Sequence, residues 1–481
     1  MVLKQPFLEA IIAYCRQGIL PLHTPGHKQG AGIAAGFKDA FERWGLQLDI
    51  DPPVLPSGES WVAPTALLTA AQAMAADLFG AAETFFLTNG TSAGIQAMFL
   101  AAGKQGKVVL PRQVHTSVIS ALIISDCTPI FVKPRGTSSD LPDSRLDPDE
   151  LRFVLSATDG IRAVFTQNPS YYGFAADLRP IAQIAHEYQV PLLVDEAHGP
   201  HFSFSADLPQ AALQAGADLV AQSTHKLLTS LTGSSMLHVS RAYRHLDLGR
   251  CVDLVQSTSP SFLLLASLEA AVFQLAEVGE QLVEQVLSLA TAFRERVKDL
   301  PGITILGDEE IQAWGYPDYD RTKLVLDFSG LGLTGLEAAA ILRQEYQIQT
   351  EMADFRRVLA VLGPGDTEEG IIRLEQALRL MAAKYYQGRK LPDPPALPGF
   401  SELAMTPREA FFAAAAEVPL AQAAGMVAAE IIAPYPPGIP VVIPGEIITR
   451  EQIQYLEELA AYGFNIAGTT GGVPRRLRVV I

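Results

Sequence analysis

The chain carries the sequence VPLLVDEAH at residues 190–198, an apolar run followed by two acids and an imidazole. A run with apolar residues at nearly every position predicts a strand that is covered on both faces, as in a parallel sheet. Asp195 follows this run directly and is therefore expected at the carboxyl end of the strand. Open α/β sheets bind their ligands at that end.

A second stretch of the same kind, ADLVA at residues 217–221, leads into Ser223-Thr224-His225-Lys226. Two neighbouring strand ends then offer a carboxylate and an amine to one crevice. Pyridoxal 5′-phosphate (PLP) requires such a pair, a lysine for the Schiff base and an acid that keeps the pyridinium nitrogen protonated. Taken alone, Lys226 is more often a solvated loop residue and Asp195 a helix N-cap. Their combination favours the cofactor.

A third stretch predicts an anion site. The expected strand 84–88 leads into the turn Asn89-Gly90-Thr91-Ser92-Ala93-Gly94, which opens a helix expected from Ile95 to Ala102. The free N–H groups and the dipole of a helix N-terminus attract a phosphate, and two hydroxyls add donors. Plain N-capping by Thr91 or Ser92 is the structural alternative.

Further apolar runs at 107–111, 129–132 and 161–166 alternate with helical patterns. This is the βαβ rhythm of a parallel sheet, so the fold class is expected to be α/β. His115 falls on the loop after the first of these runs, and the segment 169–173 closes the third at the same end of the sheet. A helix is also expected at 6–17, and another at 66–80.

The second half of the chain predicts a smaller unit. A long helix is expected from Ser259 to about Leu300, then a strand at 323–328 and a helix that ends near Tyr346. The intervening turn at 330–335 matches G-x-G-x-x-G, with Glu351 where a ribose-binding acid would lie, but a lone motif is weak evidence for NAD. We interpret it as a strand–turn–helix with Thr334 as the N-cap.

Composition and proline content set the domain organisation. A length of 481 residues exceeds one ordinary core. The proline-rich segment 388–400 predicts a linker, an acidic, Ala-rich helical segment is expected after it, and the prolines at 434–440 indicate a rigid loop. The expected units are an N-terminal segment, a PLP-binding large domain, a small α/β domain and a C-terminal domain, at residues 1–60, 61–300, 301–390 and 391–481.

The charge and the cysteines exclude several classes. A net charge of −16 argues against nucleic acid, and no apolar stretch is long enough to predict a membrane span. Three scattered cysteines suit a reducing cytoplasm without disulfides. His198 and His201 are spaced as metal ligands sometimes are, but no third ligand fits the spacing of a known site, and no metal is expected.

Five motifs in collinear order resemble the Orn/Lys/Arg decarboxylases, PLP enzymes of the aspartate-aminotransferase fold, and among them the shorter arginine decarboxylases of bacteria. They are Thr24-Pro25-Gly26-His27-Lys28, Asn89-Gly90-Thr91-Ser92, Asp195-Glu196-Ala197-His198-Gly199, Ser223-Thr224-His225-Lys226 and Tyr435-Pro436-Pro437-Gly438-Ile439-Pro440. Family members usually carry an acidic segment where this chain has Gly58-Glu59-Ser60-Trp61. That departure bears on the substrate or on dimer contacts, not on the PLP residues.

The resemblance implies a role for each site residue. Lys226 would form the Schiff base, Asp195 would pair with the pyridinium nitrogen, His115 would stack on the ring, and His198 would lie against its other side or near the substrate carboxylate. The phosphate would be held by Gly90, Thr91, Ser92, Ser223 and His225. Glu351 would receive the distal cation of a basic substrate, as a carboxylate is suited to do.

The activity so implied is decarboxylation of a basic amino acid in the cytoplasm, with arginine ahead of lysine and then ornithine, as a step of polyamine biosynthesis. Each site would be built by two subunits of a homodimer or a higher homo-oligomer. An aminotransferase on the same cofactor and a non-catalytic regulator on the same scaffold are the rival hypotheses. Keto-acid product would support the first, and absence of cofactor absorbance the second.

Overall fold

The computed structural model describes residues 66–132, 144–388, 391–435, 438–471 and 475–481, together with positions 9, 12, 13 and 16. Those four positions are helical and belong to the helix expected at 6–17. The motif at 24–28 and the segment 58–61 lie outside the described residues.

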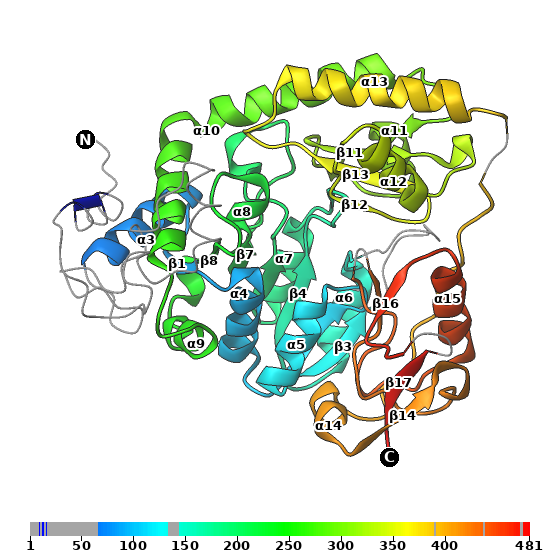
Figure 1. Ribbon diagram of the computed structural model, residues 1–481. Helices are drawn as coiled ribbons and strands as arrows, with labels where there is room; N and C mark the ends of the chain where they lie inside the picture. The colour runs from blue at the N-terminus through cyan, green and yellow to red at the C-terminus, as the bar shows by residue number, and fades with distance from the viewer. Residues whose placement is uncertain are drawn as a thin grey trace.

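A seven-stranded sheet forms the centre of the molecule (Figure 1), with the strand order β1-β8-β7-β6-β4-β2-β3. All its strands are parallel except β8, which runs antiparallel to both neighbours. Its strands in chain order are β1 (Glu83–Leu87), β2 (Lys107–Pro111), β3 (Thr128–Val132), β4 (Ile161–Gln167), β6 (Leu192–Asp195), β7 (Leu219–Gln222) and β8 (Ser235–Val239). The expected α/β class is confirmed.

The two strands that matter most for the site lie at the middle of this sheet. Every residue of β6 and of β7 is buried, as expected for strands covered on both faces. Strand β6 begins at Leu192, after Pro191, which has no N–H to donate. Asp195 is its last residue and pairs in register with Gln167 on one side and Ala221 on the other.

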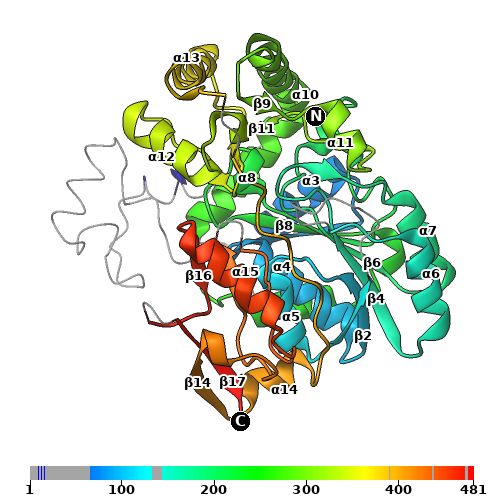
Figure 2. The same ribbon diagram turned by 90° about the vertical axis from the view of Figure 1, so that its right-hand side faces the viewer.

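Helices cover the sheet on both faces (Figure 2). One face packs against α3 (Ala66–Phe79), α4 (Gly90–Met98), α5 (Thr116–Ser125), α9 (Leu248–Val255) and the first half of α10 (Phe262–Val297). The other face packs against α6 (Pro148–Ala157) and α7 (Arg179–Glu187). The sheet is therefore the middle layer of three, and its strand ends are left for a site.

Helix α10 links two apolar cores, because its first half packs on the large sheet and its second half on the four-stranded sheet described next. Its backbone is broken at Val278 (φ −138°, ψ 17°). By length and composition α10 is apolar enough to cross a membrane, but half of its most apolar 18-residue stretch is buried inside the molecule. That burial is typical of the core helix of a folded domain.

A four-stranded antiparallel sheet lies beyond α10, in the order β12-β13-β11-β9. Its strands are β9 (Thr304–Ile305), β11 (Lys323–Asp327), β12 (Met352–Ala353) and β13 (Arg357–Val361), and its helices are α11 (Asp308–Ala313), α12 (Gly335–Glu345) and α13 (Glu368–Tyr385). A short ladder of β5 (Phe174–Ala175) with β10 (Asp318–Tyr319) joins it to the large sheet's loops.

This sheet settles the meaning of the glycine-rich turn at 330–335. Thr334 caps α12 through a capping box with Glu337, as the sequence predicted. Both neighbours of β11 run antiparallel, so the parallel βαβ unit of a dinucleotide fold is not formed here. The NAD alternative is wrong.

The chain from residue 391 onward folds against both sheets. Its elements are α14 (Pro407–Phe412), β14 (Ala415–Pro419), β15 (Ala433–Tyr435), α15 (Arg450–Ala461), β16 (Asn465–Ala467) and β17 (Arg476–Val480). The prediction of a helical segment after residue 400 is wrong. Helix α14 is only six residues long, and the strand β14 that follows it pairs with β17. Pairing with β17 at every position from Ala415 to Pro419 outweighs alanine's helix propensity there.

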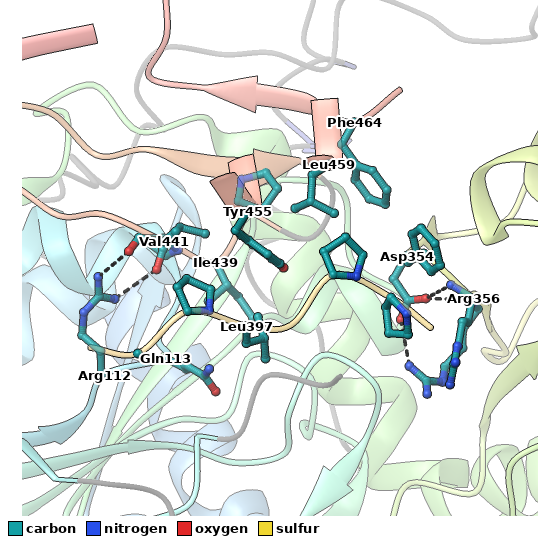
Figure 3. A pocket seen from close by; sticks show the side chains of 18 of the residues that line it. Arg112, Gln113, Asp354, Arg356, Leu397, Ile439, Val441, Tyr455, Leu459 and Phe464 are labelled. Atoms are coloured by element: carbon teal, nitrogen blue, oxygen red, sulfur yellow. Dashed lines mark hydrogen bonds and ion pairs between the residues drawn. The ribbon is translucent and has the colours of Figure 1, made fainter. Parts of the chain in front are cut away.

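Arg112, directly after β2, anchors this C-terminal part (Figure 3). Its guanidinium forms a bidentate pair with Glu446, through Nε at 2.7 Å and Nη2 at 2.8 Å. It also donates to the backbone carbonyls of Pro440 and Val441, as Figure 3 shows for Val441. Side-chain exposure is 3% for Arg112 and 0% for Glu446. Arg112 thereby fixes the backbone at Pro440 and Val441 next to the carboxyl end of β2. The domain boundaries at 60, 300 and 390 stay predictions.

Candidate active site

A cavity of about 430 Å³ opens at the carboxyl ends of β4, β6 and β7. Enzyme pockets for small molecules are commonly of this size. Nine of the ten residues predicted from sequence line it: Gly90, Thr91, Ser92, His115, Asp195, His198, Ser223, His225 and Lys226. The tenth, Glu351, lies beside it.

The position of Asp195 as the last residue of β6 orients its carboxyl. Its Oδ1 accepts a hydrogen bond from the backbone N–H of Ala197 at 3.0 Å, and only 4% of the residue is exposed. Burial raises the pKa of this carboxyl, against the opposing effect of His115 and Lys226. A buried carboxylate of this kind is stabilised by a cationic partner.

Lys226 lies on the single turn of α8 (Thr224–Leu227) that follows β7. Its Nζ is 2.9 Å from Nε2 of His198. Burial lowers the pKa of Lys226, although Asp195 and Glu351 oppose this. A lowered pKa leaves more of the amine in the unprotonated form that attacks a carbonyl.

His198 is held neutral. Burial lowers its pKa well below the ordinary range, and the neighbouring cations Lys323 and Lys226 act in the same direction. Its neutral Nε2 can then accept the hydrogen bond that the ammonium of Lys226 donates. The ring of Tyr171 lies against it, with 4.5 Å between the centroids.

Three hydroxyls gather at the N-terminus of α4. Thr91 Oγ1 lies 2.5 Å from the Oγ of Ser223 and 2.8 Å from that of Ser235. His225 donates from Nδ1 to the carbonyl of Ser234 at 2.6 Å. This cluster, together with the free N–H groups of a nine-residue helix, can bind a phosphate.

The start of α4 corrects one prediction. The helix was expected from Ile95, but it begins at Gly90, so Thr91 and Ser92 belong to its first turn. The N-cap is Asn89, without a side-chain cap bond. Capping by Thr91 or Ser92 is therefore wrong, because Thr91 bonds to hydroxyls of two other elements. Gly90 has φ +70°, which favours glycine at the bend into the helix.

His115 is positioned as the N-cap of α5. Its Nδ1 accepts from the backbone N–H of Ser117 at 3.2 Å and lies 2.8 Å from the Ser117 hydroxyl. Burial lowers the pKa of His115, while Asp195 raises it. A ring fixed by its own helix cap, close enough to Asp195 to affect its pKa, is suited to lie over a flat ligand.

Glu351 reaches the cavity through Tyr171. It precedes β12, and its backbone N–H donates to Leu359 of β13. Its Oε1 accepts from the Tyr171 hydroxyl at 2.6 Å. Tyr171 lines the cavity, so the carboxylate of Glu351 lies next to it.

Several residues of the site were not predicted from sequence. Gln167 and Tyr171 line the cavity, and Ser235 completes the hydroxyl cluster. The position of Gln167 at the end of a central strand was the available signal, since the same rule identified Asp195. For Ser235, on the antiparallel strand β8, the sequence held no comparable signal.

Behind Asp195 runs a chain of buried polar groups. Glu196 accepts from the backbone N–H of Ala212 and from Nε2 of Gln222, each at 2.7 Å. Gln222 Oε1 lies 3.0 Å from His238 Nε2, and His238 Nδ1 lies 2.8 Å from the Thr84 hydroxyl. Burial raises the pKa of Glu196 to about 8 and lowers that of His238 to about 3. These hydrogen bonds tie the end of β6 to β7, β8 and β1.

The metal alternative finds no support in the part of the chain that the structure describes, where no three His, Cys, Asp or Glu side chains form a cluster that could hold an ion. His201 instead lies 3.1 Å from the buried carboxylate of Asp320. It is a structural histidine joining the large sheet's loops to the segment before β11.

A second, smaller cavity of about 100 Å³ lies between the two sheets and the C-terminal part (Figure 3). Its lining is mostly apolar and includes Leu397, Tyr455, Leu459 and Phe464. Asp354 closes one end and accepts a hydrogen bond from Tyr172. None of the predicted site residues lines it.

The residues of the first cavity fit PLP. The buried carboxylate, the amine on the next strand end, the hydroxyl cluster at a helix N-terminus and the imidazole ring match the four parts of that cofactor that a protein must hold. Fold and site together define a chain with the PLP-dependent transferase fold.

Comparison with known proteins identifies the family. The model of the Orn/Lys/Arg decarboxylase major domain matches residues 5–370, and that of the C-terminal domain of the same family matches residues 395–469. The chain belongs to the Orn/Lys/Arg decarboxylase family. It is accordingly an amino-acid decarboxylase, and the resemblance seen in the sequence is confirmed.

Individual relatives span nearly the whole chain. The arginine decarboxylase of Bacillus subtilis (strain 168) is 37% identical, covering 99% of this chain and 98% of the relative. That of Halalkalibacterium halodurans is 36% identical, with the same coverage. The crystal structure of the Francisella novicida lysine decarboxylase LdcF superposes with a TM-score of 0.85 at 21% identity, over 99% of this chain and 81% of that one.

Proposed function

We propose that this enzyme decarboxylates L-arginine to agmatine and CO₂ with PLP as its cofactor. The observation that carries the proposal is the pair of groups on adjacent strand ends, the buried carboxyl of Asp195 and the amine of Lys226, in a chain whose relatives at 36–37% identity are named arginine decarboxylases. When bound, PLP supplies an electron sink for the bond to the departing carboxylate.

The protein's own groups would divide the work. Asp195 would pair with the pyridinium nitrogen of the cofactor and favour its protonated state, which draws electrons best. Lys226 would hold the cofactor through its amine, and either that amine or His198 would supply the proton that Cα needs once CO₂ has left. Thr91, Ser223 and His225, with Gly90 and Ser92, hold the phosphate.

Glu351 would bind the distal cation of the substrate. Its carboxylate is partly exposed, lies at the rim of the cavity and attracts Lys226 electrostatically. A carboxylate pairs with a guanidinium through two parallel hydrogen bonds, which an ammonium cannot make. Lysine, the substrate named for the more distant structural neighbour, is the second candidate.

The setting of the enzyme forms part of the proposal. We place it in the cytoplasm, in polyamine biosynthesis, as a homodimer or a higher homo-oligomer whose sites take residues from two subunits. The four units bounded at residues 60, 300 and 390 are proposed as its domains. Sedimentation of the purified protein tests the assembly, and a monomer that retains full activity would contradict it.

Product analysis tests the activity. Purified, PLP-loaded protein is offered arginine, lysine and ornithine separately, and agmatine from arginine is expected. Lys226→Ala should lower the rate at least a thousandfold, roughly the loss seen when a covalent catalyst is removed. Lys298→Ala, which changes an exposed lysine, is the matched control and should keep the wild-type rate.

Other products would redirect the proposal. Cadaverine or putrescine would keep the mechanism and replace the substrate. A keto acid would indicate transamination. No amine from any of the three, with PLP bound, would contradict decarboxylation of these substrates.

A further inference from the structure

Tyr171 lies between the two ends of the proposed substrate site. Its ring centroid is 5.7 Å from Nζ of Lys226, and its hydroxyl is 2.6 Å from Oε1 of Glu351. A substrate attached at the Lys226 end whose distal cation reaches Glu351 must therefore run alongside this ring. The sequence placed the segment 169–173 at this end of the sheet but assigned no role to Tyr171.

The ring is fixed from several sides. The backbone carbonyl of Tyr171 accepts from Nζ of Lys323 at 2.8 Å, and Lys323, at the start of β11, is only 1% exposed. The ring itself packs on His198, and its hydroxyl is held by Glu351. Contacts from both sheets thus hold one aromatic face in place, at little further entropic cost on binding.

The ring already has two amines beside it. The Nζ of Lys226 lies 5.7 Å from its centroid and that of Lys323 lies 6.0 Å away, and burial lowers the pKa of both amines, that of Lys323 to about 7. Aromatic faces attract cations at these distances because their π-electrons carry negative charge. The ring face and the carboxylate of Glu351 at its hydroxyl end are therefore the two groups here that favour a positive ligand.

We propose that Tyr171 is a specificity-determining residue, whose ring and the carboxylate of Glu351 together form a cradle for a planar guanidinium. The proposal rests on the proposed function and deepens it. It assigns the preference for arginine to two groups carried by different sheets: Tyr171 follows β4 of the large sheet, and Glu351 precedes β12 of the small one.

The chemistry of the two cations decides the preference. A guanidinium is flat, weakly hydrated and able to stack on a ring while its edge bonds a carboxylate. An ammonium is a compact, strongly hydrated point charge that gains less from the ring face. Loss of the ring should therefore weaken binding of a guanidinium more than that of an ammonium.

The test compares Tyr171→Phe, which keeps the ring, with Tyr171→Leu, which removes it. Tyr172→Phe is the control, since it removes a hydroxyl from the adjacent residue, whose partner is Asp354 at the smaller cavity. The measurements are kcat and KM for arginine and for lysine, and calorimetric Kd values of the PLP-loaded protein for agmatine and for cadaverine.

In Tyr171→Leu we expect KM for arginine and Kd for agmatine to rise by roughly 3- to 30-fold, the range of a desolvated cation–π contact. The lysine and cadaverine values should change less than about threefold, as should all values in Tyr171→Phe and Tyr172→Phe. Equal losses for both cations would overturn the cradle. So would a lower kcat with an unchanged agmatine Kd, because a ring that only supports His198 would produce that result.

The two proposals fail in different ways. Wild-type protein that makes no agmatine, yet binds it and loses that affinity in Tyr171→Leu, would overturn the proposed substrate and support the cradle. Wild-type protein that makes agmatine, with a Tyr171→Leu variant that binds agmatine equally well, would overturn the cradle alone.

Discussion

Glu196 shows how one buried residue links the site to folding stability. It follows Asp195 directly, is fully buried, and its pKa is raised from about 4.5 to about 8, chiefly by burial. In the unfolded chain the same carboxyl ionises near its ordinary pKa. Between these two pH values the unfolded state has released a proton that the folded state keeps, so stability falls as pH rises and levels off above about 8.

Glu196→Gln should remove this pH dependence. Relative to wild type, the variant's free energy of unfolding should rise between pH 5 and pH 8 by on the order of 2–4 kcal/mol, because each pKa unit is worth about 1.4 kcal/mol. Any cost of placing two amides face to face is the same at every pH and cancels. Unfolding in guanidinium chloride at pH 5 and at pH 8 measures the free energy of unfolding of both proteins.

The exposed Glu150, in the first turn of α6, gives the control, and Glu150→Gln should follow the wild-type pH dependence. A Glu196→Gln curve parallel to wild type would mean that Glu196 is ionised in the folded protein.

Residues that follow directly on one strand end could be placed from the sequence, and the structure brings them to one cavity. Asp195, Lys226 and Thr91 each follow a recognisable apolar run, so the rule for parallel sheets found them. Tyr171 and Lys323 were missed, because their importance arises from a hydrogen bond between segments 152 positions apart. No local pattern records such a contact.

Two glycines inside helices show how packing can oppose the helix propensity of a residue. Gly279 lies in α10, beside the break at Val278, and a Cβ placed there would come within 2.7 Å of the Phe204 ring. Gly370 lies in α13, where a Cβ would meet nothing nearer than 3.7 Å. Alanine favours a helix over glycine by about the same amount at either place, so the difference between them is packing.

Alanine substitutions at the two glycines should change stability in opposite directions. Gly279→Ala should lower the free energy of unfolding by about 1–3 kcal/mol, since the Phe204 ring must move. Gly370→Ala should raise it by up to about 1 kcal/mol. Urea unfolding of both variants measures the changes, and stabilisation by Gly279→Ala would mean that the ring yields freely.

Helix and strand predictions failed for the same physical reason. The run of alanines after residue 400 indicates a helix, yet Ala415 and Ala416 pair with β17, which lies more than sixty positions later. The first residue of a helix also depended on a distant group. Helix α4 starts at Gly90, and the N–H of Gly90 donates to the carbonyl of Gly233. Predictions held best for long periodic segments such as α10.

A buried ion pair joins the C-terminal part of the molecule to the large sheet. The Arg112–Glu446 pair connects the C-terminal part to β2, and Glu446 also accepts from the backbone N–H of Ile443 at 3.0 Å. Removing one partner of a buried pair leaves the other charge without compensation. The C-terminal part should therefore loosen as a unit when the pair is broken.

Glu446→Ala should lower the free energy of unfolding by about 3–5 kcal/mol, whereas the double variant Arg112→Met with Glu446→Met should recover most of that loss. Glu417→Ala, at a half-exposed ion pair of the same region, should cost less than about 1 kcal/mol. Chemical denaturation tests all three, and a loss below 1 kcal/mol for Glu446→Ala would show that the pair does not hold the C-terminal part.

The division of the site between two sheets has an evolutionary consequence. Asp195, Lys226 and the hydroxyl cluster are all carried by the large sheet and the helices next to it, while Glu351 and Lys323 come from the four-stranded sheet. Mutations at Glu351 can therefore accumulate while the strand ends that carry Asp195 and Lys226 stay intact, whereas Tyr171, whose ring packs on His198, is free to change only within narrower limits. A lineage of such enzymes would explore new side chains at one end while inheriting the same bond-breaking machinery at the other.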